Sequence, residues 1–395
     1  MNKASRQHML VALSLGTALC LSIGPASAAQ FTQINLATDD QSVLTGLGFT
    51  AASFVDPHLI NPWGMAAAPN GPFWVSNQGD ATSTLYQPTG QPLSLVVSIP
   101  GSATGPTGPT GQVFNGGSGF DLPTGGSARF LFANLDGSIA GWNPSSGTAA
   151  TVMVPAASNA RSAIYTGLAL GSIGGSGHLY AANGATGQID VFDSNFVPTT
   201  LAGNFVDPGD NPEGLVPFNV ANIGDRLFVT YAIAGPESDE AELGSGFVSE
   251  FNLDGTFVRR LTDGGPLASP WGLAVAPDSF GDLAGALLVG NFNEEFGQIN
   301  AFSLTDGSSL GPLLGTDGNA ITIPYLWALA PGSSSNAAKS IFFTAGIGDE
   351  EHGLFGRFDN ATPVPEPATW ALMLVGMGAI GISMRRRHTI RVQFA

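Results

Sequence analysis

Cysteine is almost absent from this 395-residue sequence, and the only one, Cys20, lies in an N-terminal apolar run. We expect that run to be removed, so the mature chain has no disulfide, no thiol nucleophile and no thiolate metal site. Histidine is scarce, and His58, His178 and His352 in the central region have no metal-ligand spacing. We therefore predict no catalytic residue from these motifs.

Positive charge is the second shortage. Six of the 13 lysine and arginine residues lie in the two ends of the chain, whereas only one of the 30 aspartate and glutamate residues does. The central region thus keeps 7 basic and 29 acidic residues, a net charge near −22. Repulsion from phosphates disfavours nucleic acid and anionic lipid as partners, and it leaves cations and neutral ligands open.

The N-terminus has the segment order of a secretory signal peptide. Lys3 and Arg6 precede an apolar run from Met9 to Ile23, and the small residues Ala26-Ser27-Ala28 follow it. We therefore predict that residues 1–28 are a cleaved signal peptide and that the protein is exported.

The C-terminus carries a second targeting pattern. The motif Val364-Pro365-Glu366-Pro367 ends a linker at residues 361–367, an apolar stretch covers residues 368–384, and Arg385-Arg386-Arg387 begins a basic tail at residues 385–395. A helix over the apolar stretch reaches about 25 Å, which is enough for a thin bilayer. We predict a transmembrane helix at residues 368–384 with the arginines on the cytoplasmic side.

This C-terminal pattern resembles the PEP-CTERM sorting signal. The resemblance implies that an exosortase recognises the tail in the inner membrane, cleaves near the motif and releases the protein toward the cell surface or the extracellular space. It also implies a host that makes extracellular polysaccharide. His388 to Ala395 extend past the usual end of such tails. The resemblance does not indicate what the central region does.

The central region, residues 29–360, repeats one pattern at intervals of about 48 to 60 residues. Each copy has a strand of the form Pro-aromatic-Gly-aliphatic-Ala, a second apolar strand ending in Asn or a small residue, and a third strand with aliphatic and aromatic residues. The first strands lie at Pro62–Ala66, Tyr165–Ala169, Pro217–Ala221, Pro270–Ala274 and Pro324–Ala328, and we place that of the degenerate second copy at Gly119–Leu122. A unit of this length with four short strands is typical of a β-propeller blade.

The repeats predict an all-β protein, a propeller with six blades. Fourth strands are expected at Leu93–Ile99, Ala149–Val154 and Thr256–Leu261. The sixth copy lacks one, and Phe31–Leu36 supplies it from the N-terminus, which closes the ring without an open edge. We interpret the Thr-Gly-Pro stretch within residues 101–120 as a loop, and a seventh blade hidden there is the alternative.

The Pro-x-Gly strand followed by Tyr/Trp-Val-x-Asn resembles NHL-type repeats and, more loosely, the six-bladed gluconolactonase and calcium-dependent phosphotriesterase group. A PEP-CTERM-associated propeller family is also suspected. The looser resemblance implies a divalent ion held in the pore by Glu, Asn and Asp, with lactonase or phosphotriesterase activity. Asn61-Pro62-Trp63-Gly64 replaces the Glu-Gly-Pro start of that group's first inner strand, which removes an expected carboxylate ligand.

Acidic and amide side chains are expected to gather on one face of the ring. The loops between second and third strands open on the same face as the loops before the first strands, and they hold most of the acids. Because Ca²⁺ prefers six to eight oxygen ligands, we predict a calcium site at this rim or in the pore. The alternative is that the acids are solvated and the asparagines form turns. The candidate ligands are Asn77, Asp80, Asn134, Asp136, Asn183, Asn219, Asn291, Glu294, Glu295, Asp349, Glu350 and Glu351.

Two functions stay open at this point. The favoured one is a non-catalytic envelope protein that binds a polysaccharide, a partner protein or calcium, and the alternative is a divalent-metal-dependent hydrolase. Three or four oxygen ligands converging inside the pore beside a free carboxylate would favour the enzyme. Trp63, Trp271 and Trp327 fall on inner strands, where we expect core packing, with sugar stacking as the alternative.

Overall fold

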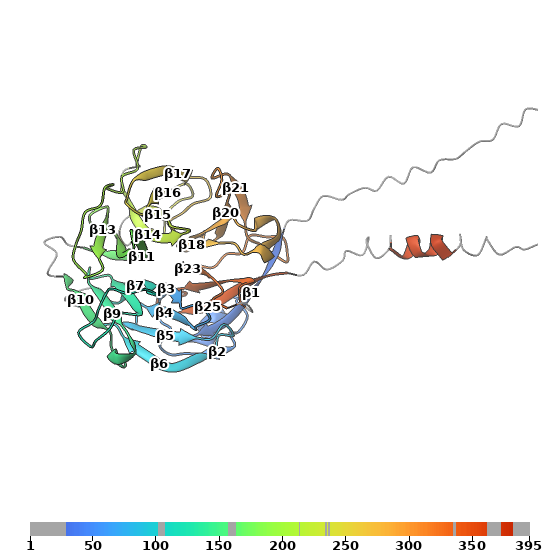
Figure 1. The fold of residues 1–395 in the computed structure, drawn as a ribbon. Coiled ribbons are helices and arrows are strands. Elements are labelled where there is room, and N and C mark those ends of the chain that lie inside the picture. The colour runs from blue at the N-terminus through green and yellow to red at the C-terminus, as the bar shows by residue number, and fades with distance from the viewer. Residues whose placement is uncertain are drawn as a thin grey trace, which may run out of the picture.

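The computed structural model describes residues 29–101, 107–156, 163–212, 214–233, 235, 238–334, 337–361 and 373–381. Within these residues the strands form six sheets, arranged as the blades of one ring (Figure 1). The prediction of an all-β propeller with six blades is confirmed, and the alternative of seven blades is wrong.

Each blade is built from consecutive strands that run from the ring axis outward. The inner strands are β3 (Pro62–Ala67), β7 (Pro109–Phe114), β11 (Tyr165–Ile173), β14 (Leu215–Ile223), β18 (Pro270–Val275) and β23 (Leu326–Pro331). The second strands are β4 (Phe73–Asn77), β8 (Phe130–Asn134), β12 (Ser176–Asn183), β15 (Arg226–Ile233), β19 (Leu287–Asn291) and β24 (Ser340–Ala345). The third strands are β5 (Thr82–Tyr86), β9 (Ile139–Trp142), β13 (Gln188–Asp193), β16 (Phe247–Asn252), β20 (Ile299–Phe302) and β25 (Leu354–Asn360). The fourth strands formed within a blade are β6 (Pro92–Ser98), β10 (Thr151–Val154), β17 (Phe257–Asp263) and β21 (Ser309–Pro312).

The remaining elements lie in loops within a blade, between blades or at the ring closure. They are β1 (Gln30–Thr38), α1 (Gln41–Gly46), β2 (Phe54–Val55), η1 (Pro144–Ser146), η4 (Asp278–Leu283) and β22 (Leu314–Gly315). Helix α1 begins after Asp40 because that carboxylate accepts the backbone N–H groups of Ser42 and Val43. Leu44 is its buried residue and anchors the helix to the core.

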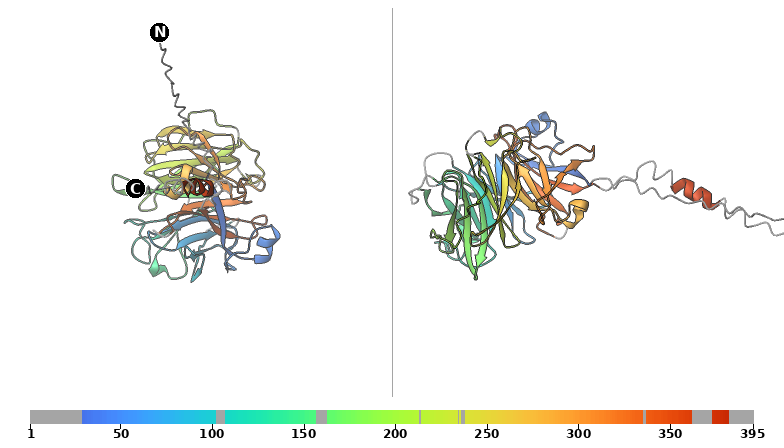
Figure 2. Two further views of the ribbon diagram at one scale, coloured as in Figure 1. Left: turned by 90° about the vertical axis from the view of Figure 1, so that its right-hand side faces the viewer. Right: turned by 90° about the horizontal axis from the view of Figure 1, so that it is seen from above.

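The hydrophobic core is divided among the interfaces between neighbouring blades. On β4, Phe73 and Val75 pack against Phe342 and Phe355 of the sixth blade, whereas Trp74 packs toward the second blade. Successive residues of a strand point to opposite faces, so a strand with a blade on each side is apolar throughout. This explains why the second strands read as continuous apolar runs. Figure 2 shows the twisted sheets packed face to face around the ring.

The N-terminal strand closes the ring, as predicted. β1 runs antiparallel to β25, from Phe31 opposite Asn360 to Thr38 opposite Leu354, and it completes the sixth blade. The ring of Phe31 is 1 % exposed and lies 4.6 Å from that of Phe280. The first and last strands are therefore joined by backbone hydrogen bonds and by buried side chains.

The second blade corrects one prediction. Its inner strand is Pro109–Phe114, inside the stretch interpreted as a loop, and not Gly119–Leu122. Residues 119–122 instead belong to the connection to β8, where Asp121 makes an isolated bridge with Ser127. Thr110 stands where four of the other copies have an aromatic residue, as does Thr166 of the third copy, and the strand still keeps Pro109 and Gly111 of the repeat. The expected fourth strands are confirmed as β6, β10 and β17.

The glycine of the repeat lets neighbouring inner strands approach each other at the pore. A Cβ on Gly64 would lie 2.3 Å from the carbonyl oxygen of Thr110, and one on Gly272 would lie 2.5 Å from that of Trp327. No side chain fits at these distances, so the repeat needs glycine for steric reasons.

The ring has two faces, which we call the acidic face and the tail face. The acidic face carries the loops before the inner strands and between the second and third strands, where the predicted calcium ligands lie. The tail face is the opposite one, and Ala361 N donates there to the carbonyl of Gln30, so the chain enters and leaves the ring at one place.

Candidate functional site at the pore mouth

Three tryptophans close the pore near the acidic face. Trp63, Trp271 and Trp327 are the second residues of β3, β18 and β23. The rings of Trp63 and Trp327 stack with centroids 3.6 Å apart, and Trp271 meets Trp327 edge-on at 5.6 Å. Their exposed fractions are 7 %, 4 % and 1 %, respectively. The packing interpretation is confirmed, and little ring surface is left for stacking against a sugar.

Three further rings complete this cluster, which we call the aromatic plug. Phe292 stacks on Trp327 at 3.8 Å, and Phe218 and Tyr325 each lie within about 6 Å of Phe292. The plug consists of Trp63, Phe218, Trp271, Phe292, Tyr325 and Trp327.

A cavity of about 360 Å³ lies on the tail-face side of the plug. Its walls are later residues of the inner strands, such as Ala66, Val113, Leu170 and Leu273, together with Trp271 from the plug itself. The plug therefore separates this cavity from the loops of the acidic face.

Asn61 lies at the turn into β3 and contacts the plug. Trp327 Nε1 donates to Asn61 Oδ1 over 3.1 Å, and Asn61 Nδ2 donates to Gln78 Oε1 at 2.9 Å and to Glu350 Oε1 at 3.0 Å. Its φ of 43° is left-handed, a conformation that asparagine adopts more readily than most residues. Both ends of the amide are thus engaged, and Asn61 links the first and sixth blades above the pore.

Glu350 brings a carboxylate to this network from the loop between β24 and β25. Burial raises the pKa of Glu350, the negative charge of Asp239 raises it further, and the hydrogen bond from Asn61 partly opposes both effects. The folded protein therefore disfavours the ionised form of Glu350. A bound cation would reverse this, because an opposite charge favours the ionised form.

Other acids surround Tyr325 at the same place. Tyr325 Oη donates to Asp349 Oδ1 over 3.0 Å, and Glu294 N donates to the carbonyl of Asp239. Burial raises the pKa of Tyr325, as do the charges of Asp349, Glu294 and Asp239. We call Asp239, Glu294, Asp349 and Glu350 the mouth acids, since the first three act on Tyr325 of the plug and Asp239 also acts on Glu350.

The structure therefore unites three of the twelve predicted ligands, namely Glu294, Asp349 and Glu350. Glu295 and Glu351 lie in the same two loops and are exposed, as are Glu294 and Asp349, whereas Glu350 is half-buried. Asp80 pairs with His58, their Oδ2 and Nδ1 atoms 2.7 Å apart, and Asp136 accepts the backbone and hydroxyl groups of Ser138. These two aspartates each serve a turn in their own blade.

The predicted asparagines also bond locally. Asn77 donates to Thr84, Asn134 to Ser138, and Asn291 to the carbonyls of Pro266 and Phe296. Asn183 Nδ2 donates to Asp190, while its Oδ1 accepts backbone N–H groups of the adjoining turns. Asn219 donates to the carbonyl of Trp271 inside the pore. In these positions the amides hold turns and strands, as the turn-forming interpretation expects.

Sequence reasoning missed Asn61, Gln78 and Tyr325 as members of the site. Asn61 and Tyr325 each directly precede the first residue of an inner strand and have left-handed φ values of 43° and 55°. Ser269 before β18 has a similar φ of 48°, so this conformation marks the turn into an inner strand and does not single out the site. Gln78 follows a second-strand Asn and carries no such signal.

No preformed metal cluster is present in the described part of the chain. There, no group of three or more His, Cys, Asp or Glu side chains is arranged to hold a metal ion. Glu213 and Glu237, which belong to the acidic loops, lie outside the described residues. The calcium site stays a prediction.

Comparison with known proteins gives the family and the tail. The model of the PEP-CTERM protein-sorting motif matches residues 363–387. "Uncharacterized protein L690" of Acanthamoeba polyphaga mimivirus is 33 % identical over 344 residues, which cover 84 % of this chain and 87 % of that protein. "Uncharacterized protein R648" of the same virus is 34 % identical over 345 residues, with 84 % and 81 % covered. The chain belongs to the family of these two proteins.

The family's propeller also has counterparts among solved structures. The soluble aldose sugar dehydrogenase of Escherichia coli, in its apo-form, superimposes with a TM-score of 0.51 at 14 % identity, over 84 % of this chain and all of that one. At that identity the likeness supports the fold alone, a six-bladed propeller that resembles NHL-like and gluconolactonase-like propellers.

The sorting motif lies mainly outside the described residues. Val364, Pro365, Glu366, Pro367 and the three arginines are not described, and residues 373–381 are helical. In the portion that is described, no helix has the length and apolar character needed to span a bilayer.

Proposed function

We propose that this protein is an exported binding protein of the cell envelope, and that it binds through its acidic face rather than through its pore. The aromatic plug carries this proposal. A metal-dependent hydrolase of the propeller type needs oxygen ligands that converge inside the pore with a free carboxylate as base. Here six rings fill that place, and the amide of Asn61 is fully bonded.

The sorting motif supports delivery to the envelope. We propose that residues 1–28 are removed on export and that residues 368–384 hold the chain in the inner membrane with the arginines in the cytoplasm. Cleavage by an exosortase near Pro365-Glu366-Pro367 then releases the propeller toward the surface or the extracellular space. Since the chain leaves the ring on the tail face, the acidic face would point away from that membrane.

The mouth acids indicate the chemistry of the ligand. Their charges act on Tyr325 and Glu350 at the pore mouth, and the central region has few cations to balance them. We propose Ca²⁺ as the cofactor of this face, since carboxylate oxygens are its preferred ligands. An extracellular polysaccharide, bound through that ion, is the proposed partner.

Calcium titration of the full-length chain in detergent, read by thermal unfolding, tests the proposal. We expect the melting temperature to rise between micromolar and millimolar Ca²⁺, because a ligand that binds only the folded state stabilises it by about 2.7 kcal/mol at a hundredfold excess over Kd. Replacing Asp349 with Asn and Glu350 with Gln together should remove the rise. Asp282→Asn, an exposed acid in η4 on the tail face, is the control and should keep it.

Two results would count against the proposal. A wild-type melting temperature unchanged up to about 10 mM Ca²⁺, well above the range of extracellular calcium modules, removes the cofactor. Chelator-sensitive turnover of a lactone or phosphotriester would favour the hydrolase instead.

A further inference from the structure

The axial channel of the ring is closed at one end and open at the other. The aromatic plug closes it toward the acidic face, and the cavity of about 360 Å³ continues behind the plug. Wall residues next to the plug, such as Leu168, Asn219 and Ala328, are buried, whereas Ala66 and Leu170, further along their strands, are half-buried. Solvent therefore reaches this cavity from the tail face.

The walls of this pore cavity carry no charged side chain. All six inner strands contribute to them, and of the described residues that line the cavity none is Lys, Arg, His, Asp or Glu. Most of the lining side chains are aliphatic, among them Ala66, Val113, Leu170, Leu273 and Leu329. The cavity is thus an apolar, uncharged space inside a region whose net charge is near −22.

The few amides in the wall are bonded to the backbone of the ring. Gln112 Nε2 donates to the carbonyl of Gly64, and Asn219 Nδ2 donates to that of Trp271 over 2.8 Å. Asn222 Nδ2 donates to a carbonyl of β11, also over 2.8 Å. These bonds join neighbouring inner strands, so the amide N–H groups serve the ring itself.

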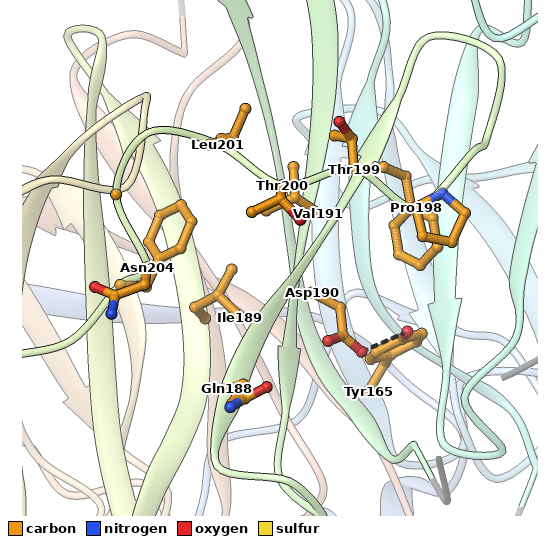
Figure 3. A pocket seen from close by; sticks show the side chains of 13 residues that line it. Tyr165, Gln188, Ile189, Asp190, Val191, Pro198, Thr199, Thr200, Leu201 and Asn204 are labelled. Atoms are coloured by element: carbon orange, nitrogen blue, oxygen red, sulfur yellow. Dashed lines mark hydrogen bonds between the residues drawn. The ribbon is translucent and has the colours of Figure 1, made fainter. Parts of the chain in front are cut away.

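A second cavity, of about 450 Å³, lies beside β13 and has a different character. Figure 3 shows the carboxylate of Asp190 facing Tyr165, whose Oη donates to it over 2.9 Å. Another wall consists of residues 198–205, which cross to the fourth blade, where Gly203 N donates to the carbonyl of Asp254. The carboxylate in this cavity is already bonded, so it does not define the chemistry of a ligand.

We propose that the pore cavity binds a small uncharged aliphatic molecule, which enters from the tail face. Ligand sites are typically concave, mostly apolar spaces of about 300–1,000 Å³. The net charge of the ring repels an anion, and a cation buried here would have no carboxylate partner. At about 30 Å³ for a group the size of a water molecule, the cavity holds roughly twelve such groups. A medium-chain alcohol has this size, with its chain toward the plug and its hydroxyl toward the solvent.

This ligand is additional to the calcium and the polysaccharide proposed for the acidic face. The plug separates the two places, and no mouth acid is among the residues that line the pore cavity. The inference therefore does not rest on the proposed function, and either can fail without the other.

Fluorescence quenching tests the proposal, because Trp271 belongs to the wall of the cavity. Alcohols with a bromine at the far end of the chain are titrated against the full-length chain in a sterol-based detergent, which has no free alkyl chain to compete. All samples carry Trp370→Phe in the C-terminal apolar stretch, so that brominated alcohol in the micelle is not counted. We expect saturable quenching, with an affinity that rises about fourfold for each added methylene and stops rising at about ten carbons, when the cavity is full.

Larger wall residues should block the site. Ala66→Leu and Val113→Phe add bulk at half-buried positions of adjacent blades, and we expect each to weaken binding about tenfold or more. Ala284→Leu, at an exposed position directly after η4, is the matched control and should bind as the wild type does. Brominated carboxylates and amines of the same length should bind about tenfold more weakly than the alcohol, because the walls offer no opposite charge.

Three results would overturn the proposal. The first is quenching that does not saturate, or an affinity that keeps rising with chain length beyond the size of the cavity. The second is unchanged binding by Ala66→Leu and Val113→Phe chains that melt as the wild type does. The third is tighter binding of a charged counterpart than of the alcohol. If neither blocking variant folds, the chain-length series on the wild type still decides, because an unspecific apolar surface sets no limit on chain length.

Discussion

The third and sixth blades both lack a fourth strand from their own repeat, but only the sixth gains one from elsewhere in the chain. Each forms three paired strands from its own repeat, but β1 completes the sixth, whereas β13 stays at an edge of the third. The completed blade is fixed further by Asp39, which accepts the N–H of Gly353 and pairs with His352 at 2.6 Å. The ring thus contains one blade of three paired strands, and in the sixth blade the further strand closes the ring.

Contacts with the fourth blade explain why the residues after β13 do not complete the third blade. Residues that could have completed the third blade are held on the fourth, where Asp207 pairs with Arg260 at 2.8 Å and accepts the hydroxyl of Ser249 at 2.6 Å. Phe205 packs between Tyr180 and Phe251. The open edge is therefore a consequence of stronger contacts elsewhere, not of a missing segment.

Removing β1 should have the largest effect. Deletion of residues 30–38 exposes the cavities left by Phe31 and Leu36, each worth about 2–3 kcal/mol of burial, and it breaks the ladder to β25. The loss is comparable to the whole stability of a typical domain, so we expect no cooperative unfolding transition by calorimetry. Adding a synthetic peptide of residues 29–40 should restore it. A deleted chain that melts within a few degrees of wild type would contradict the closing role.

Breaking the anchor on the fourth blade should cost less. Asp207→Asn leaves Arg260 without its more buried partner, and we expect a loss of about 3 kcal/mol in urea unfolding at pH 7. Asp263→Asn removes the exposed partner of the same arginine and should cost below about 1 kcal/mol.

The pH dependence of the Asp207 effect follows from its pKa. Burial raises the pKa of Asp207, but the hydrogen bonds from Arg260, Ser249 and Gly209 outweigh it and lower the pKa overall. A lowered pKa stabilises the fold above the unfolded value of 3.8 and loses that contribution as the pH falls through the folded value. The gap between wild type and Asp207→Asn should therefore close in acid. A gap that is constant with pH would mean that the ion pair does not hold this segment.

Much of the fold could be predicted because the same steric demand recurs in several blades. Gly64 and Gly272 are required by neighbouring backbone, and the apolar second strands by burial on both sides. The prediction failed in the second blade, where Thr110 of the inner strand lies within the Thr-Gly-Pro stretch that was interpreted as a loop. Its hydroxyl donates to the carbonyl of Tyr165 over 2.7 Å, a contact that no pattern in the sequence indicates.

The site was less predictable because it depends on contacts between distant segments. The order of strands and loops predicted acids on one face, but only the fold brings Glu350 to Asn61, 289 positions away in sequence. The open edge of β13 was invisible for a similar reason. The residues after it are ordinary turn and strand formers, and the tertiary contacts of Gly203 and Asp207 direct them to the next blade.

A glycine substitution tests whether the third blade is unfinished only at its outer edge. A Cβ on Gly167 of β11 would lie 2.3 Å from Asn219 Oδ1 and 2.7 Å from the Cα of that residue. We expect Gly167→Ala to cost about 2 kcal/mol in urea unfolding, as for other overpacked sites. Gly46→Ala, at a helical position with open space around it, is the control and should be neutral or slightly stabilising. A cost near zero for Gly167→Ala would show that the inner half of this blade is loose as well.

The smallest expected effect on the melting temperature comes from Glu350, a carboxylate in a loop of the sixth blade that has no counterpart in the third blade. The loop between β12 and β13, residues 184–187, has no acid, whereas the equivalent loop of the sixth blade places Glu350 on Asn61. Because the pKa of Glu350 is raised above its unfolded value of 4.5, ionisation destabilises the folded state as the pH rises through the folded pKa.

Glu350→Gln keeps an oxygen acceptor for Asn61 and removes the charge, so it should melt above wild type at pH 7 without calcium. That advantage should shrink as the pH approaches 4.5, where the wild-type group is protonated in the folded protein. Asp282→Asn should show no such trend. If Glu350→Gln melts below wild type at pH 7, the carboxylate is already compensated in the folded state, and the case for a cation at the pore mouth is lost with it.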